Sequence, residues 1–171
     1  LTFAFFSADF FVSLAIVDGR GRSTLYAGSV IMVGAFTWTA GSWVQTRLVR
    51  TWGYRGPVVL GLALVALGVG VFASVLLESV PLPVAYLGTM VSGFGIGVSY
   101  SPLSQVVLVD AEPGRVGKAA SAVQLCDVLG VSIRIGAGGA VVAAGDRLGW
   151  QTNSALGIVY AGAVAVALFA L

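Results

Sequence analysis

The feature that most constrains this chain is a long apolar stretch, residues 118–144, which carries Asp127 and Arg134 inside it. At about 27 residues it can cross a bilayer as a helix, because about 20 residues suffice for one crossing. A charge near the centre of such a helix costs about 2.5–3.5 kcal/mol on insertion scales. At about 100° per residue, Asp127, Arg134 and Gln124 fall on one face of the helix. We therefore expect this polar stripe to face protein or water rather than lipid.

The composition of the whole chain indicates the same environment. Of the 171 residues, 58% are apolar and 9% are charged, whereas soluble domains carry about a quarter charged residues. The chain cannot cover a globular surface with polar groups, so we predict an integral membrane protein in a lipid bilayer. The net charge of +2 does not indicate a nucleic-acid partner, because the basic residues lie mostly at segment ends rather than in a patch.

The sequence has no histidine, and Cys126 is its one cysteine. This excludes Ser-His-Asp and Cys-His catalytic machinery, zinc sites built on histidine or on four thiolates, and haem held by histidine. An intrachain disulfide is impossible. We therefore predict no metal site and no cofactor.

Six apolar segments follow one another, and we expect each to be a transmembrane helix. Their approximate ranges are 1–17, 24–46, 57–77, 84–108, 118–144 and 154–171. The chain starts without an initiator Met and stops inside an apolar run, so we expect a piece of a longer protein. Basic residues favour the side where the first segment begins, which places both ends of the piece in the cytoplasm. That side has Arg47, Arg50, Arg55, Arg115 and Lys118, and the other side has Arg20, Arg22 and Arg147.

Polarity varies along the chain with a period of three segments. The third and sixth segments are the least polar, while the others carry Asp9, Trp38, Tyr100, and Asp127 with Arg134. Two three-helix units, each with an outer third helix facing lipid, would produce this pattern. Because three is odd, the second unit enters the membrane from the opposite side. Such inverted repeats are typical of secondary transporters, whose binding site lies near the midplane between the repeats.

Asp9 and Asp127 are the candidate proton-coupling residues. Asp9 lies at mid-membrane depth, with Thr2 and Ser13 within about 40° on the helical wheel. Intramembrane ionisable residues are functional by default, so we predict that Asp9 loads and releases a proton as access alternates. The alternative is a neutral carboxyl that only hydrogen-bonds a neighbouring helix.

Arg134 and four uncharged residues are candidates for the surface of a substrate cavity. Asp127 and Arg134 lie about 10.5 Å apart along a helix axis, so we expect a bridge through water or separate partners, of which Asp9 is one possibility for Arg134. Structural pairing is the alternative. The four uncharged candidates are Gln124, Trp38, Tyr100 and Gln105; each can instead serve interhelical hydrogen bonding or interfacial anchoring.

Three stretches carry a family resemblance: TFAFFSAD at 2–9, GSWVQ at 41–45 followed by RTWGYR at 50–55, and GRVGK at 114–118 leading into SAVQ at 121–124. They resemble the C-terminal half, helices seven to twelve, of major facilitator superfamily transporters, and among these the bacterial drug/proton antiporters. The resemblance implies an all-α bundle of six transmembrane helices, half of a twelve-helix fold, in the bacterial inner (plasma) membrane. It also implies two partners, a small-molecule substrate and a missing N-terminal six-helix half.

The middle stretch resembles a degenerate copy of the family's gating motif, which has a glycine, an acid four residues on, and then a glycine with basic neighbours. Gln45 stands where the acid would follow Gly41, and the basic residues are displaced to Arg50 and Arg55 around Gly53. The resemblance therefore implies a gating loop here, although interface anchoring is the alternative for the two arginines.

We predict that the chain is part of a secondary active transporter, for proton-coupled efflux of a small organic or amphipathic compound by alternating access, and that it is not an enzyme. An uptake carrier for a metabolite is the alternative within the family. The sequence offers few catalytic groups for an intramembrane enzyme, although Asp9 and Asp127 could form a dyad. A channel would need a repeated polar ring or a re-entrant filter loop, and neither is evident; a scaffold without transport is the remaining alternative.

Overall fold

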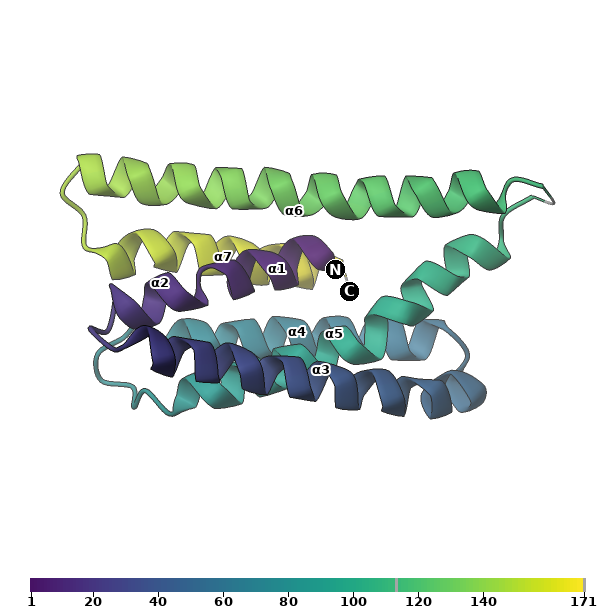
Figure 1. Ribbon diagram of the computed structural model, residues 1–171, viewed down its shortest axis with the longest axis horizontal. Helices are drawn as coiled ribbons and strands as arrows, with labels where there is room; N and C mark the ends of the chain where they lie inside the picture. Colours follow the sequence, from purple (N-terminus) through teal and green to yellow (C-terminus); the bar gives the residue numbers. More distant parts are fainter. Residues whose placement is uncertain (113, 171) are drawn as a thin grey trace.

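The computed structural model describes residues 1–112 and 114–170, and the side chains of all of these except residues 3 and 7. The described backbone is helical throughout, apart from the turns that join the helices. The helices are α1 (Thr2–Phe10), α2 (Val12–Val17), α3 (Thr24–Trp52), α4 (Arg55–Ser74), α5 (Val84–Val109), α6 (Val116–Arg147) and α7 (Thr152–Phe169). They run roughly along one axis, with α3, α4 and α5 on one side of the molecule and α6 on the other (Figure 1). Between these lie α7 and the short helices α1 and α2.

Three helices of the described residues are long and apolar enough to cross a membrane, namely α4, α6 and α7. The all-helical class is thus confirmed. Helices α3 and α5 are also long, at 29 and 26 residues, but they carry more polar and small side chains. Several of these polar groups, such as Thr89, Ser92 and Ser99 of α5, are buried against neighbouring helices.

The first segment is two helices rather than the single helix expected over residues 1–17. The hydroxyl of Tyr160 on α7 donates to the carbonyl of Ala8 at 3.0 Å, and the N–H of Phe11 donates to the same carbonyl at 3.2 Å. A side chain that enters the helical hydrogen-bond ladder is a known cause of a helix break. The break between α1 and α2 therefore follows from a contact with α7, and no Gly or Pro marks it in the sequence.

The connection expected between residues 47 and 56 is mostly helical. Helix α3 runs on to Trp52, beyond the expected end at residue 46, and the chain turns at Gly53 and Tyr54. Gly53 has φ 65°, a left-handed conformation that glycine adopts without steric cost. A single tight turn thus replaces the expected loop.

Helix α4 ends at Ser74, before the expected end at residue 77. Arg20, in the turn after α2, donates to the carbonyls of Val75, Leu77 and Val80 at 2.5–3.0 Å. A guanidinium has five N–H donors in a fixed fork, so one side chain can satisfy several carbonyls at a helix end. Arg20 therefore ties the turn after α2 to the turn that follows α4, while backbone N–H groups of residues 75–77 bond the last carbonyls of α4 itself.

Helix α5 is packed closely between α3 and α4 through small residues. A Cβ added at Gly97 would lie 2.2 Å from the carbonyl oxygen of Trp38 on α3, and one at Gly95 would lie 2.8 Å from that of Gly61 on α4. Close backbone approach at small residues is the usual way in which membrane helices associate. These contacts hold Trp38 and Tyr100 at fixed positions beside α1.

Candidate functional site

Asp127, in the first half of α6, is hydrogen-bonded by side chains from two other helices. The hydroxyl of Thr2 on α1 donates to Oδ1 at 3.0 Å, and the hydroxyl of Tyr100 on α5 donates to Oδ2 at 3.0 Å. Thr2 is buried, while Tyr100 and Asp127 are half-buried. A carboxylate within the membrane-spanning region is thus joined to two hydroxyls where α1, α5 and α6 meet.

Aromatic rings extend this group of residues. The ring of Tyr100 meets that of Trp38 on α3 at 6.2 Å between centroids, and Trp38 meets Phe5 and Phe6 on α1 at 5.6 and 5.9 Å. The Tyr100–Trp38 and Phe5–Trp38 pairs are edge-to-face, a favoured aromatic geometry, and the Phe6–Trp38 pair is tilted. We call Thr2, Phe5, Phe6, Trp38, Tyr100 and Asp127 the Asp127 cluster. Its carboxylate and ring faces can together hold an organic cation or a flat apolar group.

Asp9 does not join the Asp127 cluster. It borders a small cavity of about 10 Å³ between α1, α4 and α5, which is also lined by Phe72, Thr89 and Ser92. This is about the room that one water needs. Thr89 and Ser92 donate to backbone carbonyls, and their oxygens keep lone pairs as acceptors. In the part of the chain that the structure describes, no hydrogen bond or ion pair engages the Asp9 carboxylate.

Arg134 is directed toward α7 and not toward the Asp127 cluster. Its guanidinium donates to the carbonyl of Val159. It also lies against Gly162, where an added Cβ would be 2.8 Å from Nη2. Within the described residues no ion pair joins Arg134 to Asp9 or to Asp127. The missing side chain at Gly162 thus makes room for a polar contact between α6 and α7.

The two glutamines expected at a cavity lie on exposed surfaces. Gln124 is exposed on α6, in an open hollow of about 610 Å³ lined by that helix. Gln105 is exposed near the end of α5. The structure does not bring either into the Asp127 cluster.

The five residues of the expected gating loop are spread over a helix, a turn and a second helix. Gly41 is buried in α3, where an added Cβ would lie 2.4 Å from the carbonyl oxygen of Phe94 on α5. Gln45 is half-buried in α3 and Arg50 is exposed in its last turn, Gly53 forms the turn, and Arg55 begins α4 with an exposed side chain. Gly41 therefore serves close packing between α3 and α5 in this structure.

Reasoning from the sequence missed the partners that α1 supplies. Thr2 was grouped with Asp9 on the helical wheel, yet Thr2 contacts Asp127 while Asp9 faces α4 and α5. A wheel gives the angle of a side chain around one helix but not the neighbour that it meets at a given depth. Phe5 and Phe6, which were not selected from the sequence as site residues, pack against Trp38, and Phe5 also lines the cavity beside Asp9.

Comparison with known proteins places the chain in a family. The sequence profile described as Major Facilitator Superfamily matches residues 1–135. The chain is similar to the "Drug efflux pump JefA" of two Mycobacterium tuberculosis strains, at 29% identity over 140 residues. The match covers 82% of this chain and 27% of the pump, so the chain spans about a quarter of the length of these relatives. No solved structure gives a significant match. The chain therefore belongs to the Major Facilitator Superfamily, as its sequence motifs predicted.

Proposed function

We propose that the chain is part of a secondary active transporter that exports a small organic or amphipathic compound in exchange for protons. Membership of the Major Facilitator Superfamily supports transport, and the similarity to a drug efflux pump supports export over uptake. The observation that carries the proposal is the Asp127 cluster. There four helices, α1, α3, α5 and α6, contribute one carboxylate, two hydroxyls and a set of aromatic rings.

The Asp127 carboxylate offers one site to two competing ligands. It can hold a proton, or it can pair with a positively charged group whose apolar part rests on the rings of Trp38 and Tyr100. A proton that enters from one side of the membrane neutralises the carboxylate and releases such a substrate. Return of the proton to the other side restores the charge as access alternates. Such competition couples the movement of protons in one direction to the movement of substrate in the other.

Asp9 is the second carboxylate of the proposal. It borders a separate cavity between α1, α4 and α5 with room for about one water. A substrate cannot enter this space, but a proton can reach it. We therefore assign Asp9 to proton binding alone.

The exposed face of α6 supports a further part of the proposal, that a second bundle completes the cavity. Of its 32 residues, α6 buries Gly138 and Gly145. The apolar side chains of Leu125, Val128 and Ile133 are 58%, 52% and 64% exposed. We propose that a preceding six-helix half packs here in the plasma membrane, with the site near the midplane between inverted repeats.

The decisive experiment is Asp127→Asn in the full-length transporter, reconstituted in liposomes with a proton gradient. Asparagine keeps the shape of the side chain but loses the charge, so efflux of a lipophilic cation is expected to fall about tenfold or more, which corresponds to about 1.4 kcal/mol. Asp110→Asn, in the exposed turn after α5, is the control and should transport as the parent does.

Asp9→Asn separates the two carboxylates. It is expected to keep substrate binding, measured without a gradient, while flux responds less steeply to the proton gradient, because one of the two proton-binding carboxylates is lost. Parent-like, gradient-driven efflux in the Asp127→Asn variant would contradict the assignment of the site. Gradient-driven accumulation instead of efflux would favour the uptake alternative.

A further inference from the structure

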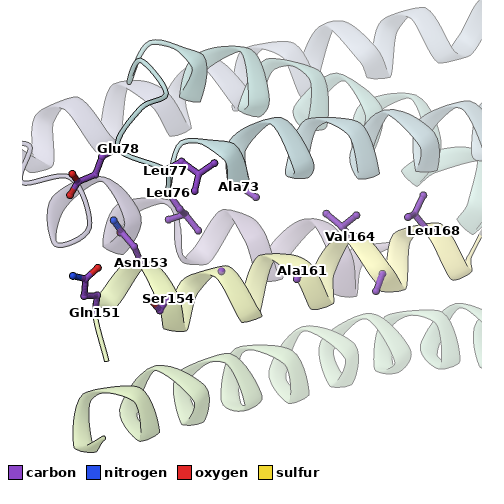
Figure 2. A pocket seen from close by; sticks show the side chains of 12 residues that line it. Ala73, Leu76, Leu77, Glu78, Gln151, Asn153, Ser154, Ala161, Val164 and Leu168 are labelled. Atoms are coloured by element: carbon purple, nitrogen blue, oxygen red, sulfur yellow. The ribbon is translucent and has the colours of Figure 1, made fainter. Parts of the chain in front are cut away.

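A groove of about 780 Å³ runs along the outer side of the bundle, where α4 and α7 meet (Figure 2). Small residues of α7, Gly157, Ala161 and Ala165, line it together with Ala73 of α4, and Leu168 lies at the far end. From Ser154 to Leu168 the helix rises about 21 Å, compared with about 15 Å for one leaflet of the hydrocarbon core. The apolar part of the groove is therefore long enough for one acyl chain.

The other end of the groove is polar. Glu78, Gln151 and Asn153 gather there, beyond the end of α4 and at the start of α7 (Figure 2). The amide nitrogen of Asn153 is directed toward Glu78, while its Oδ1 is turned to the backbone beside Gly19. Because both helices end here, this polar end lies at the level of the lipid headgroups.

The charge at this end favours a positively charged ligand group. Glu78 is the one charged residue that lines the groove, and in the described part of the chain it makes no ion pair. The nearby guanidinium of Arg20 is already engaged by the carbonyls of Leu77 and Val80. The Asn153 and Gln151 amides add donors for a phosphate oxygen. One acid beside two amides matches a headgroup that carries both an ammonium and a phosphate.

We propose that the groove between α4 and α7 binds one phospholipid with a primary-ammonium headgroup, a phosphatidylethanolamine. Its ammonium, with three N–H donors, pairs with Glu78, its phosphate accepts from the amides, and one tail lies between the two helices. A lipid with a net negative headgroup meets no cation in the lining, and a quaternary ammonium has no N–H to donate. The site is separate from the Asp127 cluster and does not depend on the proposed transport.

The test is lipid retention by the full-length transporter in detergent, measured by native mass spectrometry. The probes are phosphatidylethanolamine, phosphatidylcholine and phosphatidylglycerol with identical tails. We expect phosphatidylethanolamine to be retained up to about fivefold better than phosphatidylglycerol, which corresponds to the upper end of the range for one charge pair near a surface. Glu78→Gln should abolish this preference, and Glu112→Gln, an exposed acid before α6, should leave it intact.

A second pair of variants tests whether an acyl tail lies in the apolar part of the groove. Ala161→Phe fills the apolar channel and should lower retention of phosphatidylethanolamine, whereas Ile158→Phe, on the exposed face of α7, should not. Elution as a single monodisperse peak establishes that each variant is folded. Equal retention of the three lipids by the parent, or an unchanged preference in Glu78→Gln, would overturn the proposal. Neither outcome bears on transport at Asp127.

Discussion

Helices α5 and α6 are both long and rich in glycine, yet they pack in opposite ways. A Cβ at Gly97 of α5 would lie 2.2 Å from a backbone oxygen of α3, whereas a Cβ at Gly136 of α6 would meet nothing within 4 Å. Helix α5 buries residues from Ala85 to Pro102, while α6 buries Gly138 and Gly145. The contrast shows that a glycine-rich helix in this chain can be either a close-packed scaffold or an open face.

The polar chemistry follows the same division. Ser92 and Ser99 of α5 donate to carbonyls of their own helix, which satisfies them locally. The charged residues of α6 reach other helices instead: Asp127 accepts from α1 and α5, and Arg134 donates to α7. The more exposed of the two helices therefore supplies the carboxylate of the Asp127 cluster, while α5 contributes Tyr100 to it.

The largest effect on stability is expected for Gly97→Ala, which tests the contrast between the close-packed α5 and the exposed α6. Its Cβ cannot be placed unless α3 retreats, so the free energy of unfolding should fall by about 1–3 kcal/mol, the cost of overpacking. Gly136→Ala is the matched control, because its Cβ points into open space. Thermal unfolding of both variants in detergent is the measurement. Equal losses in the two would show that α6 is as closely packed as α5.

Tyr160→Phe tests whether α1 is held as closely as α5, through its hydrogen bond with α7. Loss of the hydroxyl that donates to Ala8 should lower the free energy of unfolding by about 0.5–1.5 kcal/mol. It should also allow the helical ladder to close across Phe11, which hydrogen exchange at residues 11–13 would report as greater protection. Tyr54→Phe, in the turn after α3, is the control. Unchanged exchange at these residues would mean that the break has another cause.

The smallest effect on stability is expected for Glu112→Gln, in the exposed turn before α6. Glu112 pairs with Arg115 at 3.2 Å, but the two side chains are 71% and 68% exposed. Solvent-exposed ion pairs contribute about 0–1 kcal/mol, so the unfolding midpoint should hardly change. A loss as large as that of Gly97→Ala would show that the approach to α6 is far more ordered than its exposure indicates.

Much of the architecture was readable from the sequence, because apolar segments of membrane length leave few alternatives to helices. The family prediction is confirmed by the profile match over residues 1–135, and the six-helix repeat arrangement stays a prediction. Trp38, Tyr100 and Asp127 were each selected as polar or aromatic residues within apolar segments, and the structure joins them.

What the sequence did not reveal depends on contacts between distant parts of the chain. The break at Phe11 follows from the contact with Tyr160, and the turn after α4 is held by Arg20 from the turn after α2. Neither leaves a local pattern, since the residues at the break are ordinary helix formers. The direction of Arg134 likewise depends on the space at Gly162, a residue of another helix.

The junction at Phe11 has a mechanical consequence. In a continuous helix a tilt of one end moves the other end with it. Two helices joined at a break can change their tilt separately. Helix α1 carries Thr2, which touches Asp127, and α2 leads into the turn that holds Arg20. The break therefore allows the Thr2 contact with Asp127 at one end and the Arg20 contacts at the other to be set by two separately oriented helices.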